Sequence, residues 1–239
     1  PRPPARSARG ESTRAMATLG IVCGMEAEAR TLGSIRDHER VMVTVTGGDP
    51  GRAERAAKRF LTAGCIRMLS WGVAGGLDPR LAPGEPVMPD MVETLDGLRY
   101  PLARHAAIGR AAAEEAPGAL MLGLAAPAMT AADKDALYHA TGAVAADMET
   151  HRLARYGAEF AVDTLAIRVV ADPATRDLPP YLADVLDARG RPRVGRVLAG
   201  LARRPATLAA LMRLRRDRAR ALARLRRIAE GGIFNRLLA

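Results

Sequence analysis

The chain has 239 residues, of which 49% are hydrophobic and 26% charged. This content is enough to bury a sizeable core, which excludes a disordered or fibrous protein. No stretch approaches the roughly 20 uninterrupted apolar residues of a membrane-spanning helix, and nothing near the start has the apolar run of a secretory signal. We therefore expect a soluble, cytoplasmic protein whose two cysteines, Cys23 and Cys65, are buried and reduced.

The net charge of +10 is concentrated at the C-terminal end. From residue 189 onward the chain holds 15 arginines against two acids, so residues 1–188 carry a net charge of −3. A strongly basic segment can attract nucleic acid, but aromatic residues make up only 3% of this chain and none interleave the arginine run. We therefore expect no nucleic-acid partner.

Apolar, β-rich runs alternate with helical patterns along most of the chain. The expected strands cover residues 18–23, 41–48, 68–76, 120–126, 143–148 and 160–172. The expected helices cover residues 25–36, 50–64, 85–95, 131–142 and 149–159. This alternation predicts a single α/β domain with a mostly parallel, twisted central sheet flanked by helices.

Composition divides the chain into three parts. Residues 1–16 are rich in Pro, Arg and Ser and predict a disordered extension, residues 17–190 form the globular domain, and residues 191–239 form a basic helical extension. Beyond a break near Pro205, apolar residues recur at helical spacing, at Leu208, Leu211, Met212, Ala219, Leu222, Leu225 and Ala229. Such a basic amphipathic helix is typical of a cover on its own domain or subunit interface, a partner-binding helix, or a helix on a membrane surface.

Two of the predicted strand ends are followed by glycine and charged residues, where open α/β sheets place their sites. Gly24–Glu28 follows the first strand, and its carboxylates also suit the positive end of the next helix. Gly47–Arg52 follows the second, and glycines with an arginine beside a helix N-terminus favour phosphate. Asp49 and Pro50 are equally consistent with a well-capped helix and no ligand.

A third segment, Ser70–Leu77, ends a predicted buried strand and holds three glycines and the only tryptophan of the chain. Glycines at this position fit a tight turn, or the close approach of a ribose or a phosphate to the backbone. The spacing is not that of a dinucleotide-binding fingerprint, and no helical pattern follows. The sequence leaves the turn and the ligand contact both open.

Two further strand ends carry carboxylates, in Asp147–Glu149 and in Arg168–Pro173. A glycosyl-transfer site needs one carboxylate to hold sugar hydroxyls and another to protonate the leaving group, and Glu149 and Asp172 could supply them. The structural alternative is that Glu149 only starts a helix and that Asp172 only pairs with Arg168.

Taken in order, five stretches resemble the signatures of the purine/uridine phosphorylase superfamily, namely GMEAEA, TGGDPGRA, WGVAGGL, ADMET and RVVADPAT. The resemblance covers residues 18 to about 190 and is strongest to the methylthioadenosine/adenosylhomocysteine nucleosidase branch. Among branches, the chain looks closest to the hopanoid-biosynthesis-associated nucleoside phosphorylase, which removes adenine from adenosylhopane. The chain departs from the family's motifs in three places. Asp147 replaces the acid that usually precedes the Met-Glu pair, Ala171 replaces the serine that precedes the family's catalytic aspartate, and the base-binding region is shortened to residues 126–130.

The resemblance implies an enzyme that cleaves the N-glycosidic bond of an adenosine with an apolar 5′ substituent. It implies that Asp172 is the catalytic acid that protonates the purine and that Glu149 binds the ribose hydroxyls beside Met148. Glu28 matches the residue that orients the attacking water in nucleosidases. Phosphorolysis of adenosylhopane is the first hypothesis, and a hydrolytic nucleosidase or a non-catalytic nucleoside-binding protein is the alternative.

The remaining implied site residues form two groups. Met129 and Val73 are expected to contact the substrate, and phosphate is expected at Gly47, Gly48, Arg52 and Gly75. Inorganic phosphate would be a co-substrate, and no metal or other cofactor is expected. The superfamily also implies a homo-oligomer, and the basic tail adds peripheral contact with the inner membrane surface as an alternative.

Overall fold

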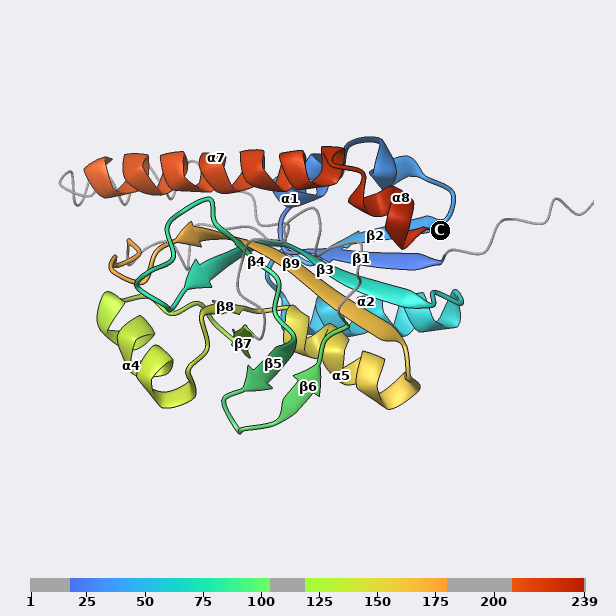
Figure 1. The fold of residues 1–239 in the computed structure, drawn as a ribbon, viewed down its shortest axis with the longest axis horizontal. Coiled ribbons are helices and arrows are strands. Elements are labelled where there is room, and N and C mark those ends of the chain that lie inside the picture. Colours follow the sequence, from blue (N-terminus) through green and yellow to red (C-terminus); the bar gives the residue numbers. More distant parts are fainter. Residues whose placement is uncertain (1–17, 104–118, 180–207, 239) are drawn as a thin grey trace, which may run out of the picture.

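The structure is a computed structural model and describes residues 18–103, 119–179 and 208–238. One sheet of nine strands lies at its centre (Figure 1). The strands are β1 (Leu19–Cys23), β2 (Val41–Val45), β3 (Arg67–Gly76), β4 (Pro86–Val87), β5 (Met91–Thr94), β6 (Arg99–Pro101), β7 (Leu120–Gly123), β8 (Ala145–Asp147) and β9 (Asp163–Asp172).

The sheet is mixed but mostly parallel. Its main path runs β2-β1-β3-β8-β7-β5-β6, and β9 pairs with both β3 and β4. The pairs β1–β2, β1–β3, β3–β9, β5–β7 and β7–β8 are parallel, whereas β3–β8, β4–β9 and β5–β6 are antiparallel. The long strand β3 therefore lies between β9 and the short strand β8, so the residues that end both of these strands come close to it.

Helices cover both faces of the sheet (Figure 1). On one side lie α1 (Glu26–Ala29), the 3₁₀ helix η1 (Arg30–Asp37), α7 (Leu208–Glu230) and α8 (Ile233–Leu237). On the other side lie α2 (Pro50–Thr62) and α5 (Thr150–Phe160), while α4 (Ala131–Thr141) flanks the β7–β8 edge. This three-layer arrangement confirms the expected α/β architecture.

Side chains that alternate along the central strands pack into two apolar cores, one on each face of the sheet. Leu69 and Trp71 pack toward α7 and α8, whereas Met68 packs toward α2 and α5. The Trp71 ring lies 5.4 Å from that of Phe234 on α8, centroid to centroid. The two C-terminal helices are thus part of the main core. Cys23 and Cys65 are both buried and unpaired, as expected.

Two expected helices differ in the structure. The helix expected over 25–36 is α-helical only at Glu26–Ala29 and continues as a 3₁₀ segment that is interrupted at Gly33, where φ is 60°. The segment 85–95 was expected to be helical but forms β4 and β5. Pro89 removes a backbone donor that a helix over this segment would need, and Val87 and Val92 are buried as strand residues.

Of the two alternatives left open for the end of β3, the tight turn is wrong, because the strand runs on through Gly76 with a register shift at Gly75. None of the glycines of this strand has a left-handed backbone, so a turn does not explain them. Their role is close approach of other groups, which the site below makes specific.

The basic tail helix is confirmed from Leu208 to Glu230, whereas the expected break near Pro205 lies outside the described residues. Its buried positions include Ala221, Leu225 and Ile228, which favours the helix as a cover on its own domain. Three residues of the expected apolar stripe, Leu208, Met212 and Ala219, are exposed instead. The α7 residues that face the neighbouring cavity are Ala210, Arg213, Leu214 and Asp217.

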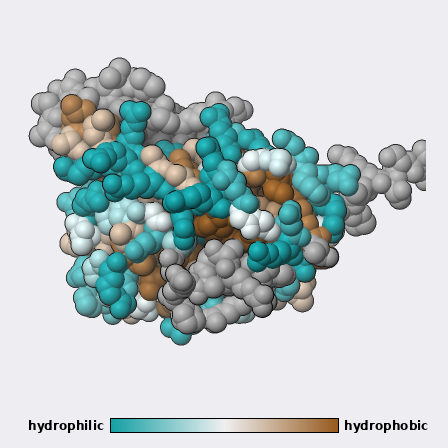
Figure 2. All heavy atoms as spheres, turned by 45° about the horizontal axis from the view of Figure 1, so that its top comes forward, coloured by the Kyte–Doolittle hydropathy of each residue, from teal (hydrophilic) through white to brown (hydrophobic). Residues whose placement is uncertain are grey.

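The outward surface of α7 is largely hydrophilic (Figure 2). In the described part of the chain, no helix is both long enough and apolar enough to span a membrane.

We predict that Phe234→Ala lowers the free energy of unfolding by about 3–5 kcal/mol, because it opens a cavity against Trp71 in the main core. Leu208→Ala on the exposed start of α7 is the control, and its effect should stay within about 0.5 kcal/mol. Urea denaturation measures both. Equal effects of the two substitutions would show that α8 is not part of the core.

Candidate active site

The site is built around Arg168, a β9 residue whose side chain is 1% exposed. Its Nη2 forms ion pairs with Asp147 and, at 3.3 Å, with Glu149, and it also donates to the Ser70 hydroxyl. Its Nη1 donates to the Val73 carbonyl at 3.3 Å. Burial disfavours the charge, but the two carboxylates raise the pKa of Arg168 above its usual range. From the middle of β9, Arg168 therefore joins the end of β8 and the start of α5 to β3.

Glu149 lies at the start of α5 and is also buried. Its Oε2 accepts from Arg168, and its Oε1 accepts from the Thr46 hydroxyl at 3.2 Å. Burial raises the pKa of Glu149 to about 7, even though Arg168 opposes the shift. The carboxylate is thus poised between its two protonation states near neutral pH, which is typical of functional rather than structural carboxylates.

Glu28 approaches the same cluster from α1. Its Oε2 accepts from the Met25 amide at 2.8 Å and its Oε1 from the Val73 amide at 2.9 Å. Burial raises its pKa, while Arg168 and the two amides oppose the shift. A Cβ at Gly72 would lie 2.7 Å from Arg168 Nη1 and 2.8 Å from the Glu28 carboxyl, so only glycine fits here.

Asp172 ends β9 and is held by Lys134 of α4. Lys134 Nζ lies 2.6 Å from Asp172 Oδ2 and is itself buried. Burial raises the pKa of Asp172, and the ammonium of Lys134 opposes that shift. The alternative pairing of Asp172 with Arg168 is wrong, because Arg168 turns to the carboxylates of Asp147 and Glu149 instead.

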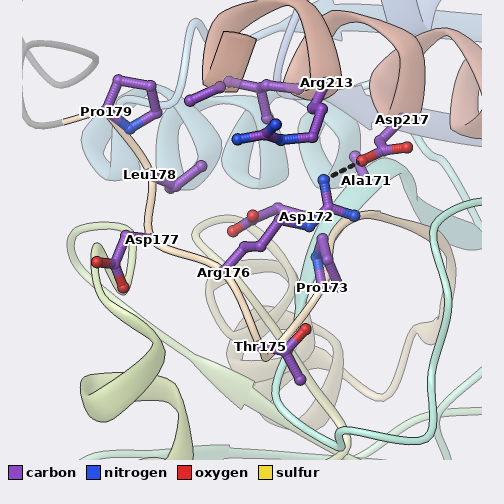
Figure 3. A pocket seen from close by; sticks show the side chains of 12 residues that line it. Ala171, Asp172, Pro173, Thr175, Arg176, Asp177, Leu178, Pro179, Arg213 and Asp217 are labelled. Carbon is purple, nitrogen blue, oxygen red and sulfur yellow. Dashed lines mark hydrogen bonds and ion pairs between the residues drawn. The ribbon is translucent and has the colours of Figure 1, made fainter. Parts of the chain in front are cut away.

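A cavity of about 340 Å³ opens beside Asp172 (Figure 3). One wall is the loop after β9, and α7 supplies the opposite wall with Ala210, Arg213, Leu214 and Asp217. The Asp217 carboxylate pairs with Arg176 across the cavity at 2.6 Å. Arg218, further along α7, donates to the Met25 sulfur at 3.2 Å. The basic helix therefore borders the site at two points.

The structure brings most of the predicted substrate residues to this region. The Val73 backbone contacts both Glu28 and Arg168, and a Cβ at Gly75 would lie 4.0 Å from the Asp172 carboxyl. The Met129 carbonyl accepts from the Leu178 amide at 2.8 Å, which ties the short base-binding segment to the loop after Asp172.

The predicted phosphate residues do not form one group. Gly47 and Gly48 form a left-handed turn, and a Cβ at Gly48 would lie 3.9 Å from the Met148 methyl group. Arg52 instead pairs with Asp49 at 3.5 Å, and Asp49 also caps α2 by accepting from the Gly51 and Arg52 amides. The prediction of a well-capped helix is therefore confirmed.

Gly75 is separate from that turn, since it lies within β3 beside Asp172.

Sequence reasoning missed Lys134 and the contribution of α7. Lys134 is one of only two lysines among 36 basic residues, a signal that could have drawn notice. Arg168 was noted only as a partner for Asp172, although an arginine in the middle of an apolar strand indicates a buried, paired charge. Among the described residues, no group of three or more His, Cys, Asp or Glu side chains could hold a metal ion.

Residues 18–200 match the Phosphorylase superfamily. The chain belongs to this superfamily. The match includes Glu28, Glu149, Arg168 and Asp172, so the carboxylates described above lie within the family region of this phosphorylase-superfamily chain. The resemblance found in its motifs is confirmed at the level of the superfamily.

Several solved structures have a similar fold. The 5′-methylthioadenosine/S-adenosylhomocysteine nucleosidase from Neisseria meningitidis, in complex with methylthio-immucillin-A, is 16% identical with a TM-score of 0.68, covering 91% of this chain and 98% of that chain. Futalosine hydrolase of Helicobacter pylori is 12% identical with a TM-score of 0.67, covering 93% and 97%. At these identities the likeness shows a shared fold alone. A comparison with curated proteins found no match.

The raised pKa of Glu149 predicts how stability changes with pH. Between its ordinary pKa and about 7, the folded protein holds a proton that the unfolded chain has lost, so the free energy of unfolding falls as pH rises through this window. Glu149→Gln removes this contribution. We expect the decrease between pH 5 and pH 8 to become smaller in the variant, by on the order of 2–3 kcal/mol.

Urea denaturation at the two pH values measures this decrease. Glu159→Gln, at the exposed end of the same helix, is the control and should retain the decrease seen in the unsubstituted protein. If Glu149→Gln also retains it, Glu149 is ionised in the folded state throughout the window.

Proposed function

We propose that this protein cleaves the N-glycosidic bond of an adenosine that carries an apolar group at its 5′ position. The observation that carries the proposal is a pair of carboxyl groups on either side of β3, buried in Glu149 and partly buried in Asp172. Glu149 is held by Arg168 after β8, and Asp172 is held by Lys134 at the end of β9. Nucleosidases and phosphorylases both need two such groups with separate tasks.

The two carboxyl groups suit the two charges that the reaction creates. Breaking the bond leaves positive charge on the ribose, and the Glu149 carboxylate would stabilise that charge while holding the sugar hydroxyls. The leaving purine gains electron density and needs a proton, which Asp172 would donate. Since burial raises the pKa of Asp172, its protonated form is available at a higher pH than in water.

Water is the nucleophile that the geometry favours. Glu28 accepts hydrogen bonds from the Met25 and Val73 amides. These amides are therefore not available to donate to a phosphate dianion. Three carboxyl groups, those of Glu28, Asp147 and Glu149, lie around Arg168, and their negative charge opposes a further anion. A buried carboxylate with a raised pKa is a suitable base to orient a water molecule.

Phosphate is the second candidate nucleophile, and with it phosphorolysis of adenosylhopane in hopanoid biosynthesis. The left-handed turn at Gly47 and Gly48 favours it, because this turn lies beside Met148 and exposes backbone near the predicted sugar site. The Arg52 side chain extends from the first turn of α2, which follows this loop, and is 36% exposed. A phosphate that displaced Asp49 from Arg52 would gain a charge-assisted contact.

The remaining partners stay predictions. An apolar 5′ group is supported by apolar side chains in the cavity beside Asp172, such as Leu178 and Leu214. Homo-oligomer formation is untested, and so is contact with a membrane surface through the exposed start of α7. Co-sedimentation of the full chain with anionic vesicles at low and high salt would test the membrane contact.

The first test is adenine release from 5′-methylthioadenosine by the purified full chain. We expect release in phosphate-free buffer at a rate within about twofold of that with phosphate. Dependence on phosphate would instead identify the phosphorylase, and adenosylhopane in place of 5′-methylthioadenosine would then test the substrate. No release from either substrate under either condition would contradict the proposed function.

The second test is Asp172→Asn, which should lower turnover by about two to four orders of magnitude, as expected when a general acid is lost. Asp163→Asn at the exposed opposite end of the same strand is the control and should leave turnover unchanged. Release by Asp172→Asn at a rate close to that of the unsubstituted protein would remove Asp172 from the mechanism.

A further inference from the structure

Lys134 is a charged side chain in an unusual place, since it is only 1% exposed. It lies in the first turn of α4, and its Nζ donates to Asp172 Oδ2 at 2.6 Å, to the Arg176 carbonyl at 2.7 Å and to the Pro173 carbonyl at 3.1 Å. All three ammonium protons thus have an acceptor. This complete set of partners offsets the cost of burying the charge.

The choice of lysine at this position is informative because the chain otherwise uses arginine almost throughout. Only Lys58 and Lys134 are lysines among its 36 basic residues. At position 134 the three acceptors converge on a single nitrogen atom, which suits the compact ammonium group. The planar fork of a guanidinium cannot direct three bonds from one atom in this way.

The charges that face Asp172 come from three elements. Lys134 faces it from α4 and Arg176 from its own loop, and both lower the pKa of its carboxyl group. Asp217 of α7 raises it, and Arg213 of the same helix lines the cavity that Asp172 borders. Lys134 is the group among these that contacts the carboxyl directly, through Oδ2.

We propose that Lys134 is the positioning residue of the proton donor. This inference rests on the proposed function. By holding Oδ2, Lys134 fixes the orientation of the Asp172 carboxyl and leaves Oδ1 to deliver the proton to the leaving purine.

The step balances with water as the second reactant, because the C–O bond that water forms at the sugar replaces the glycosidic C–N bond and Glu28 takes the proton that water releases. The O–H bond at Oδ1 breaks and an N–H bond forms on the base, while the electron pair of the glycosidic bond moves to the base. Asp172 is left as a carboxylate, which Lys134 stabilises without losing its own proton.

The test is the pH profile of adenine release by full-length variants. Activity should fall as pH rises through the pKa of Asp172, because the donor loses its proton. Lys134→Met removes the nearby positive charge, so this alkaline limb should move to higher pH by about one to three units. The maximal kcat should fall by about tenfold or more, since the freed carboxyl loses its orientation, while KM stays within about threefold.

Two further variants separate charge from structure. Lys134→Arg keeps the charge but not the convergent geometry, so its alkaline limb should stay near that of the unsubstituted protein while kcat falls. Lys58→Met removes the only other lysine, an exposed one on α2, and should change neither kcat nor the profile. Glu149 also titrates, but its contribution is common to all four proteins.

The outcomes that would overturn the inference differ from those that would overturn the function. If Lys134→Met loses thermal stability but keeps the same alkaline limb, Lys134 only anchors the loop after β9. Should that variant fail to fold, Lys134→Gln, which can still donate to the two carbonyl groups, is measured in its place against the same expectation. If the unsubstituted protein releases no base from either substrate, the proposed function itself fails.

Discussion

The buried guanidinium of Arg168 is the interaction on which the site depends. Transfer of such a charge from water into a protein interior costs several kcal/mol, and ion pairs with good geometry are needed to offset it. Here Asp147 and Glu149 supply the pairs, and the Ser70 hydroxyl adds a further acceptor. Because these groups come from β3, from β8 and from the start of α5, burying the charge also fixes how these elements meet. Burial of the guanidinium also requires glycine at position 72, because a Cβ there would collide with the Arg168 side chain.

The same arrangement works against stability near neutral pH. Carboxyl groups whose pKa values are raised by burial, as in Glu28 and Glu149, cost folding free energy when they ionise. Two apolar cores on either side of the sheet offset that cost, and the tail helices α7 and α8 belong to one of them. The basic tail therefore has two roles in this structure. Its inner face completes the core, and its first turns form a wall of the cavity beside Asp172.

Much of the fold could be predicted because periodicity and caps are local signals. The Asp49 cap of α2 and the β9 strand were clear in the sequence. The segment 85–95 could not be assigned correctly because its two strands are only two and four residues long and pair with distant parts of the chain. Site residues within motifs, such as Glu149 and Asp172, could be named from the sequence, but their partners could not. Lys134 comes from a different helix, and its contact with Asp172 depends on how α4 packs beside the end of β9, which no local pattern encodes.

The central claim is that Arg168 holds Glu149 in place to bind the sugar hydroxyls. Calorimetric titration of adenosine and of 3′-deoxyadenosine tests it most directly, in an Asp172→Asn background that suppresses cleavage. This background protein should prefer adenosine by at least about tenfold, because the deoxy analogue leaves a charged acceptor unpaired. With Arg168→Lys added and the protein still folded by circular dichroism, the preference should fall to about threefold or less. An unchanged preference would contradict the claim.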